Sequence, residues 1–134
     1  MSRKGKDVGR ERVELGQKGE KLAVNFLRKK GYRIVATNFR SPLGEVDLVA
    51  QDGDTTVFVE VKTRRSLEYG MPQESITSSK KAQILKTALI YLKKNNLGGG
   101  NYRFDVVSVV MDPDGKIKTL ELIKNAFEPD TSYG

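Results

Sequence analysis

Three charged residues in the middle of the chain have the types and the spacing of a divalent-metal site. Two runs rich in β-forming residues flank the turn Asp52-Gly53-Asp54, and this combination predicts a β-hairpin. With a two-residue loop, Asp47 lies directly opposite Glu60, and the two side chains share a face of the sheet. Side chains alternate along a strand, so Lys62 lies on the same face as Glu60.

Facing carboxylates repel each other, and the pKa of one of them rises sharply unless a cation lies nearby. A divalent ion held by Asp47 and Glu60 removes this conflict, lowers the pKa of a bound water and neutralises charge on a phosphate. Lys62 could then orient or activate the attacking water, or hold a phosphate oxygen. The same register places Glu45 opposite Lys62, where it could hold the lysine in place. The alternative is a surface salt-bridge ladder in which Asp47 and Glu45 pair with Lys62.

Apolar residues on the rest of the hairpin weaken that alternative. One face reads as wholly apolar and must be buried, and the charged face also carries Val49 and Phe58. The residues of the apolar face are Val46, Leu48, Ala50, Val57, Val59 and Val61. We therefore expect a strand pair that is covered on both sides, where a charge is costly unless it is paired or bound to a metal.

Composition restricts the chemistry that this chain can perform. The 134 residues include neither cysteine nor histidine, which excludes disulfides, thiolate sites, ordinary zinc sites and imidazole catalysis. Any metal is therefore a hard, oxygen-preferring ion such as Mg²⁺, Mn²⁺ or Ca²⁺. Lys and Arg number 24 against 17 Asp and Glu, a net charge of +7. This charge indicates either a polyanionic partner or a merely soluble basic surface.

Apolar periodicity and turn residues predict the order α-β-β-β-α-β-β. The expected helices cover 13–30 and about 77–95, and the expected strands cover 32–38, 45–51, 56–63, 102–111 and 117–124. Early strands joined by short turns pair antiparallel, while a crossover through the second helix favours a parallel pair. The predicted fold class is mixed α/β, with a mixed four- to five-stranded sheet flanked by helices.

The chain divides into one domain with two short ends. We expect a flexible basic arm over 1–12, a single domain over 13–124 and a loose tail over 125–134. No apolar run approaches the roughly 18 residues of a membrane span, and the charged N-terminus lacks the apolar stretch of a secretory signal. The expected location is the cytoplasm.

Five segments of the chain together resemble the YraN family of small bacterial proteins. They are Gly19-Glu20, Asn38-Phe39-Arg40 and the runs 44–50, 58–64 and 103–107. An isolated Glu-x-Lys motif is weak, but this ordered set at these spacings is specific, and it spans most of the chain. The YraN family is similar to restriction-endonuclease-like, or PD-(D/E)XK, proteins, whose core order α-β-β-β-α-β agrees with the prediction. Archaeal Holliday junction resolvases are the nearest functional relatives that the resemblance implies.

The resemblance implies a Mg²⁺ site, with Mn²⁺ as an alternative ion, and a role for each matching residue. Asp47 and Glu60 match the two metal-binding acids, and Lys62 matches the motif lysine. The carbonyl of Val61 would be a further metal ligand. Glu20 matches the helical acid of many members of the fold. On periodicity alone Glu20 reads as an exposed helical residue; with the resemblance it binds the metal or positions its water.

Basic and hydroxyl side chains near the predicted site could bind a phosphate backbone. They are Arg40, Arg64 and Arg65 near the hairpin ends, and Ser78, Ser79, Lys80 and Lys81 at the start of the second helix. A helix N-terminus binds anions through its free N–H groups, but an ordinary N-cap with solvated lysines is the alternative. Arg103 and Asp105 either form an internal pair or border the site.

Three functions are compatible with these features. The first is a metal-dependent endonuclease that acts on DNA phosphodiester bonds, including branched DNA such as a Holliday junction. Resolvases are homodimers, so the resemblance suggests a dimer as well. The second is a non-catalytic nucleic-acid-binding module of the same fold that serves a recombination or repair partner. The third is a basic structural adaptor without a nucleic-acid role.

Overall fold

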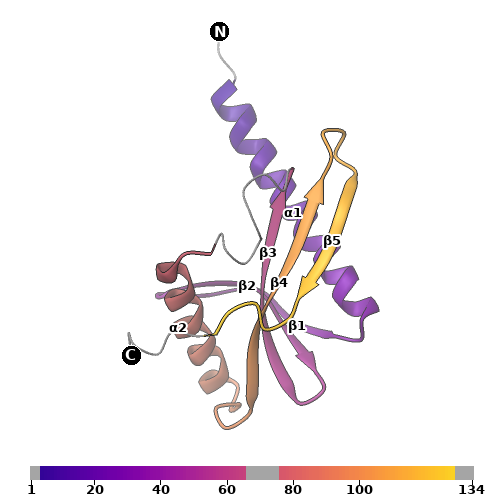
Figure 1. Cartoon of the computed structure of the whole chain (residues 1–134). Helices are drawn as coiled ribbons and strands as arrows, with labels where there is room; N and C mark the ends of the chain where they lie inside the picture. Colours follow the sequence, from indigo (N-terminus) through magenta and orange to yellow (C-terminus); the bar gives the residue numbers. More distant parts are fainter. Residues whose placement is uncertain (1–3, 66–75, 129–134) are drawn as a thin grey trace.

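The computed structural model describes residues 4–65 and 76–128. Within these ranges, residues 4–9, 11 and 12 are described by their backbone alone. Its elements are α1 (Lys4–Lys29), β1 (Arg33–Ser41), β2 (Gly44–Asp52), β3 (Thr55–Arg64), α2 (Ser78–Lys94), β4 (Asn101–Met111) and β5 (Ile117–Ile123). This order confirms the predicted α-β-β-β-α-β-β succession and the mixed α/β class (Figure 1). Most of the loop predicted between β3 and α2 lies outside the described residues.

One five-stranded sheet carries the fold, with its strands in the order β1-β2-β3-β4-β5. The pairs β1–β2, β2–β3 and β4–β5 are antiparallel, and β3 pairs with β4 in parallel. The hairpin pairs Asp52 with Thr55 and Leu48 with Val59, so the predicted two-residue loop is confirmed, and so is the register between these two pairs. The regular pairing does not extend to the predicted pairs Asp47–Glu60 and Glu45–Lys62. α2 provides the crossover between the parallel strands, as a connection of this length requires.

α1 is longer than the sequence predicts. It begins at Lys4, so the prediction of a flexible arm over 1–12 is wrong for the described residues. The prediction relied on apolar periodicity, which starts only near Leu15, but Lys, Arg and Glu extend a helix that packing has nucleated further along. The packed part includes Ala23 and Leu27, which are fully buried against the sheet. No helix in the described part of the chain combines the length and the apolar character that a membrane crossing requires.

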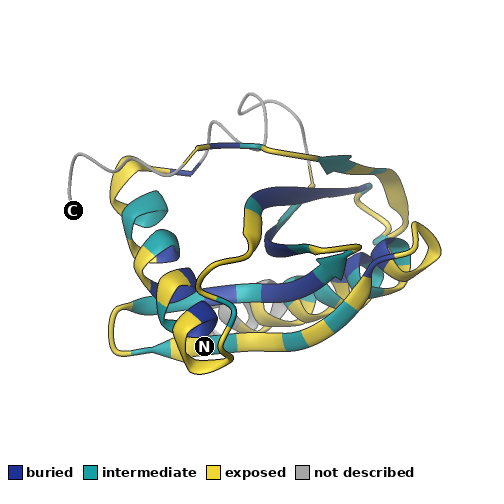
Figure 2. Cartoon of the chain, turned by 90° about the horizontal axis from the view of Figure 1, so that it is seen from below, coloured by how far each residue is buried: buried dark blue, intermediate teal, exposed yellow. Residues whose placement is uncertain are grey.

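Two buried apolar clusters lie on opposite faces of the sheet, one under each helix. The α1-side cluster is Ala23, Leu27, Tyr32, Leu48, Ala50, Val57, Val59, Val107, Val109 and Met111. The α2-side cluster is Val46, Val49, Phe58, Ile76, Ile84, Ala88, Tyr91, Leu92, Phe104, Val106 and Phe127. Figure 2 shows the buried positions concentrated on the central strands. The hairpin of β2 and β3 is therefore covered on both sides, as predicted.

The segment after β5 returns to the core. Asn125 N–H donates to Asp105 Oδ1 at 3.0 Å, and the Phe127 ring stacks on Phe104 with 5.1 Å between ring centroids. The prediction of a loose tail over 125–134 is therefore wrong at its start, while residues beyond 128 lie outside the described part. The tail prediction failed because one aromatic residue has no periodicity that would mark it as buried.

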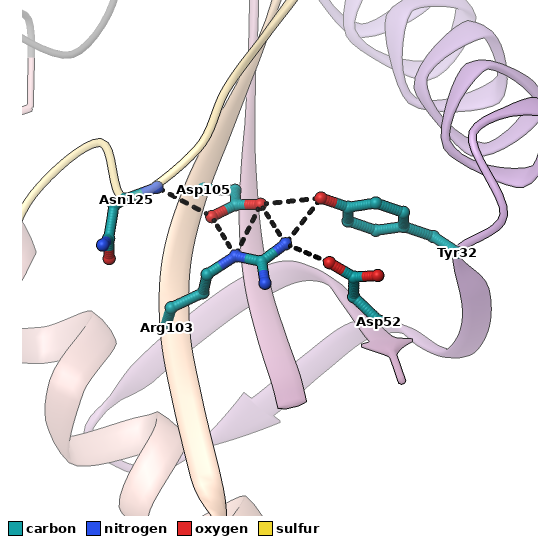
Figure 3. A network of polar contacts seen from close by, with 5 residues as sticks. All are labelled: Tyr32, Asp52, Arg103, Asp105 and Asn125. Carbon is teal, nitrogen blue, oxygen red and sulfur yellow. Dashed lines mark hydrogen bonds and ion pairs between the residues drawn. The ribbon is translucent and has the colours of Figure 1, made fainter. Parts of the chain in front are cut away.

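Arg103 and Asp105 form an internal pair, which decides between the two alternatives left open by the sequence. Asp105 is fully buried and accepts from Arg103 Nε at 3.0 Å. Arg103 Nη2 also donates to Asp52 Oδ2 at 2.9 Å and to the Tyr32 hydroxyl (Figure 3). With Asn125, this network joins the start of β1, the β2–β3 turn, β4 and the C-terminal segment. This pair is costly to break because loss of Arg103 would leave the fully buried charge of Asp105 uncompensated.

Candidate metal centre

β2 and β3 bring Asp47 and Glu60 together, as the predicted register requires. Asp47 N–H donates to Glu60 Oε1 at 3.4 Å, and Val61 N–H donates to Asp47 Oδ2 at 2.9 Å. Glu60 is only 5% exposed and Asp47 is half-buried. These crossed hydrogen bonds place both carboxylates between the two strands, directly beyond the last regular pair, Leu48–Val59.

The pleat of β2 changes face at Asp47. Val46 lies in the α2-side cluster and Leu48 in the α1-side cluster, although strict alternation would put them on one face. The prediction that Val46 shares an apolar face with Leu48 is therefore wrong. On β1, Asn38 has a left-handed backbone with φ 51°, and the β1–β2 register omits the pair Asn38–Asp47. At this break in the pairing, the Asp47 N–H bonds the carboxylate of Glu60.

Both acids have raised pKa values. Burial first, and the charge of Asp47 second, raise the pKa of Glu60 from 4.5 to about 8. Burial also raises the pKa of Asp47, although the hydrogen bonds from Val61 and Glu60 act to lower it. The positive charge of Lys80 acts to lower both pKa values. Without a closer cation, Glu60 therefore retains a proton near neutral pH, and a metal ion that binds there must displace it.

Glu20 on α1 lies at the edge of this pair. Burial and then the charge of Asp47 raise the pKa of Glu20, while a hydrogen bond from Asn38 acts to lower it. Asn38 Nδ2 donates to Glu20 Oε2 at 3.4 Å. The preceding Gly19 allows α1 to approach so closely, because a Cβ at Gly19 would lie 1.9 Å from Thr63 Oγ1. The close approach of α1 at Gly19 and the hydrogen bond from Asn38 thus hold Glu20 next to the acid pair.

The acid pair is better suited to a Mg²⁺ or Mn²⁺ ion that keeps several waters than to an ion held by protein ligands alone. Among the side chains that the structure describes, no three acidic groups come close enough together to hold an ion alone. Mg²⁺ keeps several of its waters and commonly takes only one or two carboxylates from the protein. Asp47 and Glu60 would be these two in the predicted site, and a divalent charge would remove their mutual repulsion. The ligand roles of Glu20 and of the Val61 carbonyl stay predictions.

Glu45 pairs with Arg40 and not with Lys62. Glu45 Oε2 lies 3.5 Å from Arg40 Nε, and the described side chains include no ion pair between Glu45 and Lys62. The predicted pairing is wrong because the regular pairing of β2 with β3 ends at Leu48–Val59, before Glu45 and Lys62, whereas β1 pairs along β2 and places Arg40 opposite Glu45. Lys62 is half-buried two residues after Glu60 on β3. Its role as the lysine of the site stays a prediction.

The start of α2 supplies one cation that acts on the acid pair. Thr77 is the N-cap, and its Oγ1 accepts from Lys80 N–H at 3.1 Å, so an ordinary cap is present. The half-buried Lys80 is the residue whose charge acts on both acids. Lys81 places its Nζ 5.6 Å from the centroid of the Phe127 ring, and Ser79 is exposed.

The three predicted arginines lie along the ends of β1 and β3. The Arg40 side chain is 75% exposed and extends from β1 toward Glu45. Arg64 ends β3 and is half-buried, and the exposed Arg65 follows it. Both follow Lys62 on the strand that carries Glu60, so they lie at the same end of the sheet as the acids. Their contact with a nucleic acid stays a prediction.

Asn38 is the residue of this site that the sequence prediction did not single out as functional. Its left-handed backbone interrupts β1 and its amide holds Glu20. The available signal is the residue type, because asparagine is disfavoured in strands and tolerates a positive φ better than other residues with a side chain. An asparagine within a β-forming run therefore indicates a break in the strand.

Comparison with known proteins places the chain in a family. A model described as "Uncharacterised protein family UPF0102" matches residues 19–109, which include the acids, Lys62 and Asn38. A UPF0102 protein of Caldicellulosiruptor saccharolyticus is 49% identical over 114 residues, covering 85% of this chain and 97% of the relative. A UPF0102 protein of Syntrophus aciditrophicus is 47% identical over 124 residues, covering 92% and 94%. The chain therefore belongs to the UPF0102 family, the YraN family of the predicted resemblance.

Proposed function

We propose that this protein is a Mg²⁺-dependent endonuclease that hydrolyses phosphodiester bonds in DNA. The observation that carries the proposal is the buried pair of Asp47 and Glu60, whose carboxylates face each other across two strands and have raised pKa values. A net charge of +7 supports a polyanionic substrate. The order of elements supports a place among the restriction-endonuclease-like, or PD-(D/E)XK, proteins.

The residues of the pair and its surroundings divide the work of hydrolysis. Asp47 and Glu60 hold the metal, and Val61 adds its carbonyl oxygen. When bound, Mg²⁺ lowers the pKa of a coordinated water and neutralises charge on the phosphate. Glu20 at the edge of the pair orients the attacking water, and Lys62 holds a phosphate oxygen as negative charge develops on it.

Basic residues near the pair bind the DNA backbone. Lys80 is the best supported of them, because its charge acts on both acids. The further backbone contacts are assigned to Arg40, Arg64, Arg65, Ser79 and Lys81. Branched DNA is the proposed substrate, and two cuts on symmetric strands suit a homodimer. The proposed location is the cytoplasm.

A cleavage assay with matched variants tests this function. The full chain is incubated with linear and four-way branched DNA, with Mg²⁺, with Mn²⁺ and with EDTA. Asp47→Asn and Glu60→Gln each remove one carboxylate of the pair, and Asp54→Asn removes the same charge from the exposed hairpin turn. We expect metal-dependent cutting by the wild type and by Asp54→Asn, and a loss of at least about 100-fold in the other two, as for removal of one electrostatic stabiliser. Equal cutting by all four proteins would contradict the proposal.

A non-catalytic nucleic-acid-binding module is the second candidate. It is favoured by the lack, within the described residues, of a third acid close enough to complete the metal site. This candidate predicts salt-sensitive DNA binding by the wild type and by both pair variants, without cutting by any of them. Binding is measured in the same reactions by fluorescence anisotropy.

A further inference from the structure

A groove beside the acid pair is lined by residues of which only Glu20 has a role in the proposed chemistry. It lies between α1 and β1 and has a volume of about 620 Å³. Its lining residues are Gln17, Glu20, Lys21, Val24, Asn25, Arg28, Thr37, Asn38 and Leu48. This volume lies within the range of small-ligand pockets, about 300–1,000 Å³. The groove is therefore large enough to accommodate one nucleotide-sized group.

Two residues of the groove, Glu20 and Asn38, lie at its boundary with the acid pair. Glu20 lines the groove, and the charge of Asp47 acts on its carboxylate. Asn38 also lines the groove and donates to Glu20 at 3.4 Å. The left-handed backbone of Asn38, with φ 51°, is a strained conformation of the kind that is retained at functional sites. If a DNA strand placed one phosphate at Asp47 and Glu60, the nucleotide next to that phosphate would therefore lie at the groove.

The chemistry of the lining suits an unpaired nucleotide. Carboxamide and hydroxyl groups of the lining can donate to and accept from the edge of a base, which is how unpaired bases are recognised. Lys21 and Arg28 supply positive charge for a phosphate, and the planar guanidinium of Arg28 can also stack on a base. Val24 and Leu48 supply an apolar floor. The lining thus carries two positive charges against the one negative charge of Glu20.

We propose that the groove between α1 and β1 binds an unpaired nucleotide of the DNA strand that is cut at Asp47 and Glu60. The proposal rests on the proposed function for the position of the cut, but the binding itself needs no metal. It explains why a small protein would act on branched or frayed DNA, in which single strands leave the duplex. Nucleases and base-modifying enzymes that need an unpaired base select substrates in the same way, because a base already out of the stack costs less to bind.

Binding measurements without metal test the groove. Fluorescence anisotropy in EDTA compares a labelled single strand with the same sequence as a duplex, at several salt concentrations. The double variant Lys21→Ala/Arg28→Ala removes both cations of the groove. The matched control Lys93→Ala/Lys94→Ala removes two exposed cations at the far end of α2. A thermal melt of each variant establishes that it is folded.

We expect the groove variant to bind the single strand about fivefold more weakly or worse. The slope of log affinity against log salt should become shallower by about 0.7, because the loss of one phosphate contact contributes about that much on a single strand. The control variant should retain the affinity and slope of the wild type. Equal losses in both variants, or wild-type binding by the groove variant, would overturn the proposal.

A second measurement on the wild-type protein avoids any effect of substitution on folding. In an ¹⁵N-edited NMR titration with a short single strand, the side-chain amide signals of Gln17, Asn25 and Asn38 should shift. Shifts confined to residues outside the groove would overturn the proposal. Normal cleavage with no effect of the groove variant would refute the groove alone, whereas groove binding without any cleavage would refute the nuclease alone.

Discussion

Replacement of Glu60 by glutamine should change how the stability of the metal-free protein depends on pH. Burial and Asp47 raise the pKa of Glu60 from 4.5 to about 8, so the folded state holds a proton that the unfolded state releases above pH 4.5. The stabilisation from this carboxyl group is fully present below pH 4.5 and is lost as the pH rises through about 8. The variant has no such proton to lose.

The size of this effect follows from the two pKa values. Each pH unit between them lowers the free energy of unfolding by about 1.4 kcal/mol. The interval from 4.5 to about 8 therefore corresponds to a loss of about 5 kcal/mol between acid and alkaline solution. Such a loss is a large fraction of the 5–15 kcal/mol that stabilises a typical domain.

Urea unfolding in EDTA between pH 4.5 and 9 measures the difference. The two proteins should be close in stability at pH 4.5, and Glu60→Gln should become progressively more stable than the wild type toward pH 9. Asp54→Asn, in the exposed turn of the same hairpin, should follow the wild type throughout. Parallel curves for wild type and Glu60→Gln would refute the reasoning that burial and the charge of Asp47 raise the pKa of Glu60.

Three further substitutions test how the site is positioned, each by urea unfolding. Gly19→Ala should destabilise the protein by about 1–3 kcal/mol, because the new Cβ would lie 1.9 Å from Thr63 Oγ1. Gly16→Ala, whose Cβ would have nothing within 4 Å, should instead stabilise α1, and equal effects of the two substitutions would contradict this packing. Asp105→Ala should cost about 3–5 kcal/mol, because Arg103 loses its fully buried carboxylate partner and the Asn125 N–H loses its acceptor. A loss below about 1 kcal/mol would contradict a buried pair. Asn38→Ala should lower the free energy of unfolding by about 1–2 kcal/mol, because alanine is disfavoured at φ 51°, whereas Asn38→Gly should retain it. A larger loss in the glycine variant than in the alanine variant would contradict this reasoning.

Local signals in the sequence sufficed for the order of elements and for the hairpin. The turn at Gly53-Asp54 and alternating β-formers predict a register that places Asp47 opposite Glu60. The structure has this register as far as Leu48–Val59, and a hydrogen bond from Asp47 N–H to Glu60 brings the two acids together beyond it. The change of face at Asp47 could not be predicted in this way. It depends on the conformation of Asn38 on a third strand, which hairpin periodicity does not report.

Tertiary contacts explain the other differences. Glu45 pairs with Arg40 because β1 places Arg40 opposite Glu45 on the other edge of β2, and a hairpin considered alone does not contain β1. Phe127 is buried because the chain turns back over β4 after the last strand. The position of Lys80 beside the acids likewise results from the crossover of α2, although its position at a helix start was readable from the sequence.

The central claim is that Asp47 and Glu60 together bind a divalent metal ion. Isothermal titration calorimetry of the full chain with Mn²⁺ near pH 7, repeated in two buffers of different ionisation enthalpy, tests it most directly. We predict one binding site, release of close to one proton as the Glu60 carboxyl group ionises, and loss of the binding heat in Asp47→Asn and Glu60→Gln but not in Asp54→Asn. The absence of binding heat in the wild type, or undiminished heat in both pair variants, would contradict the claim.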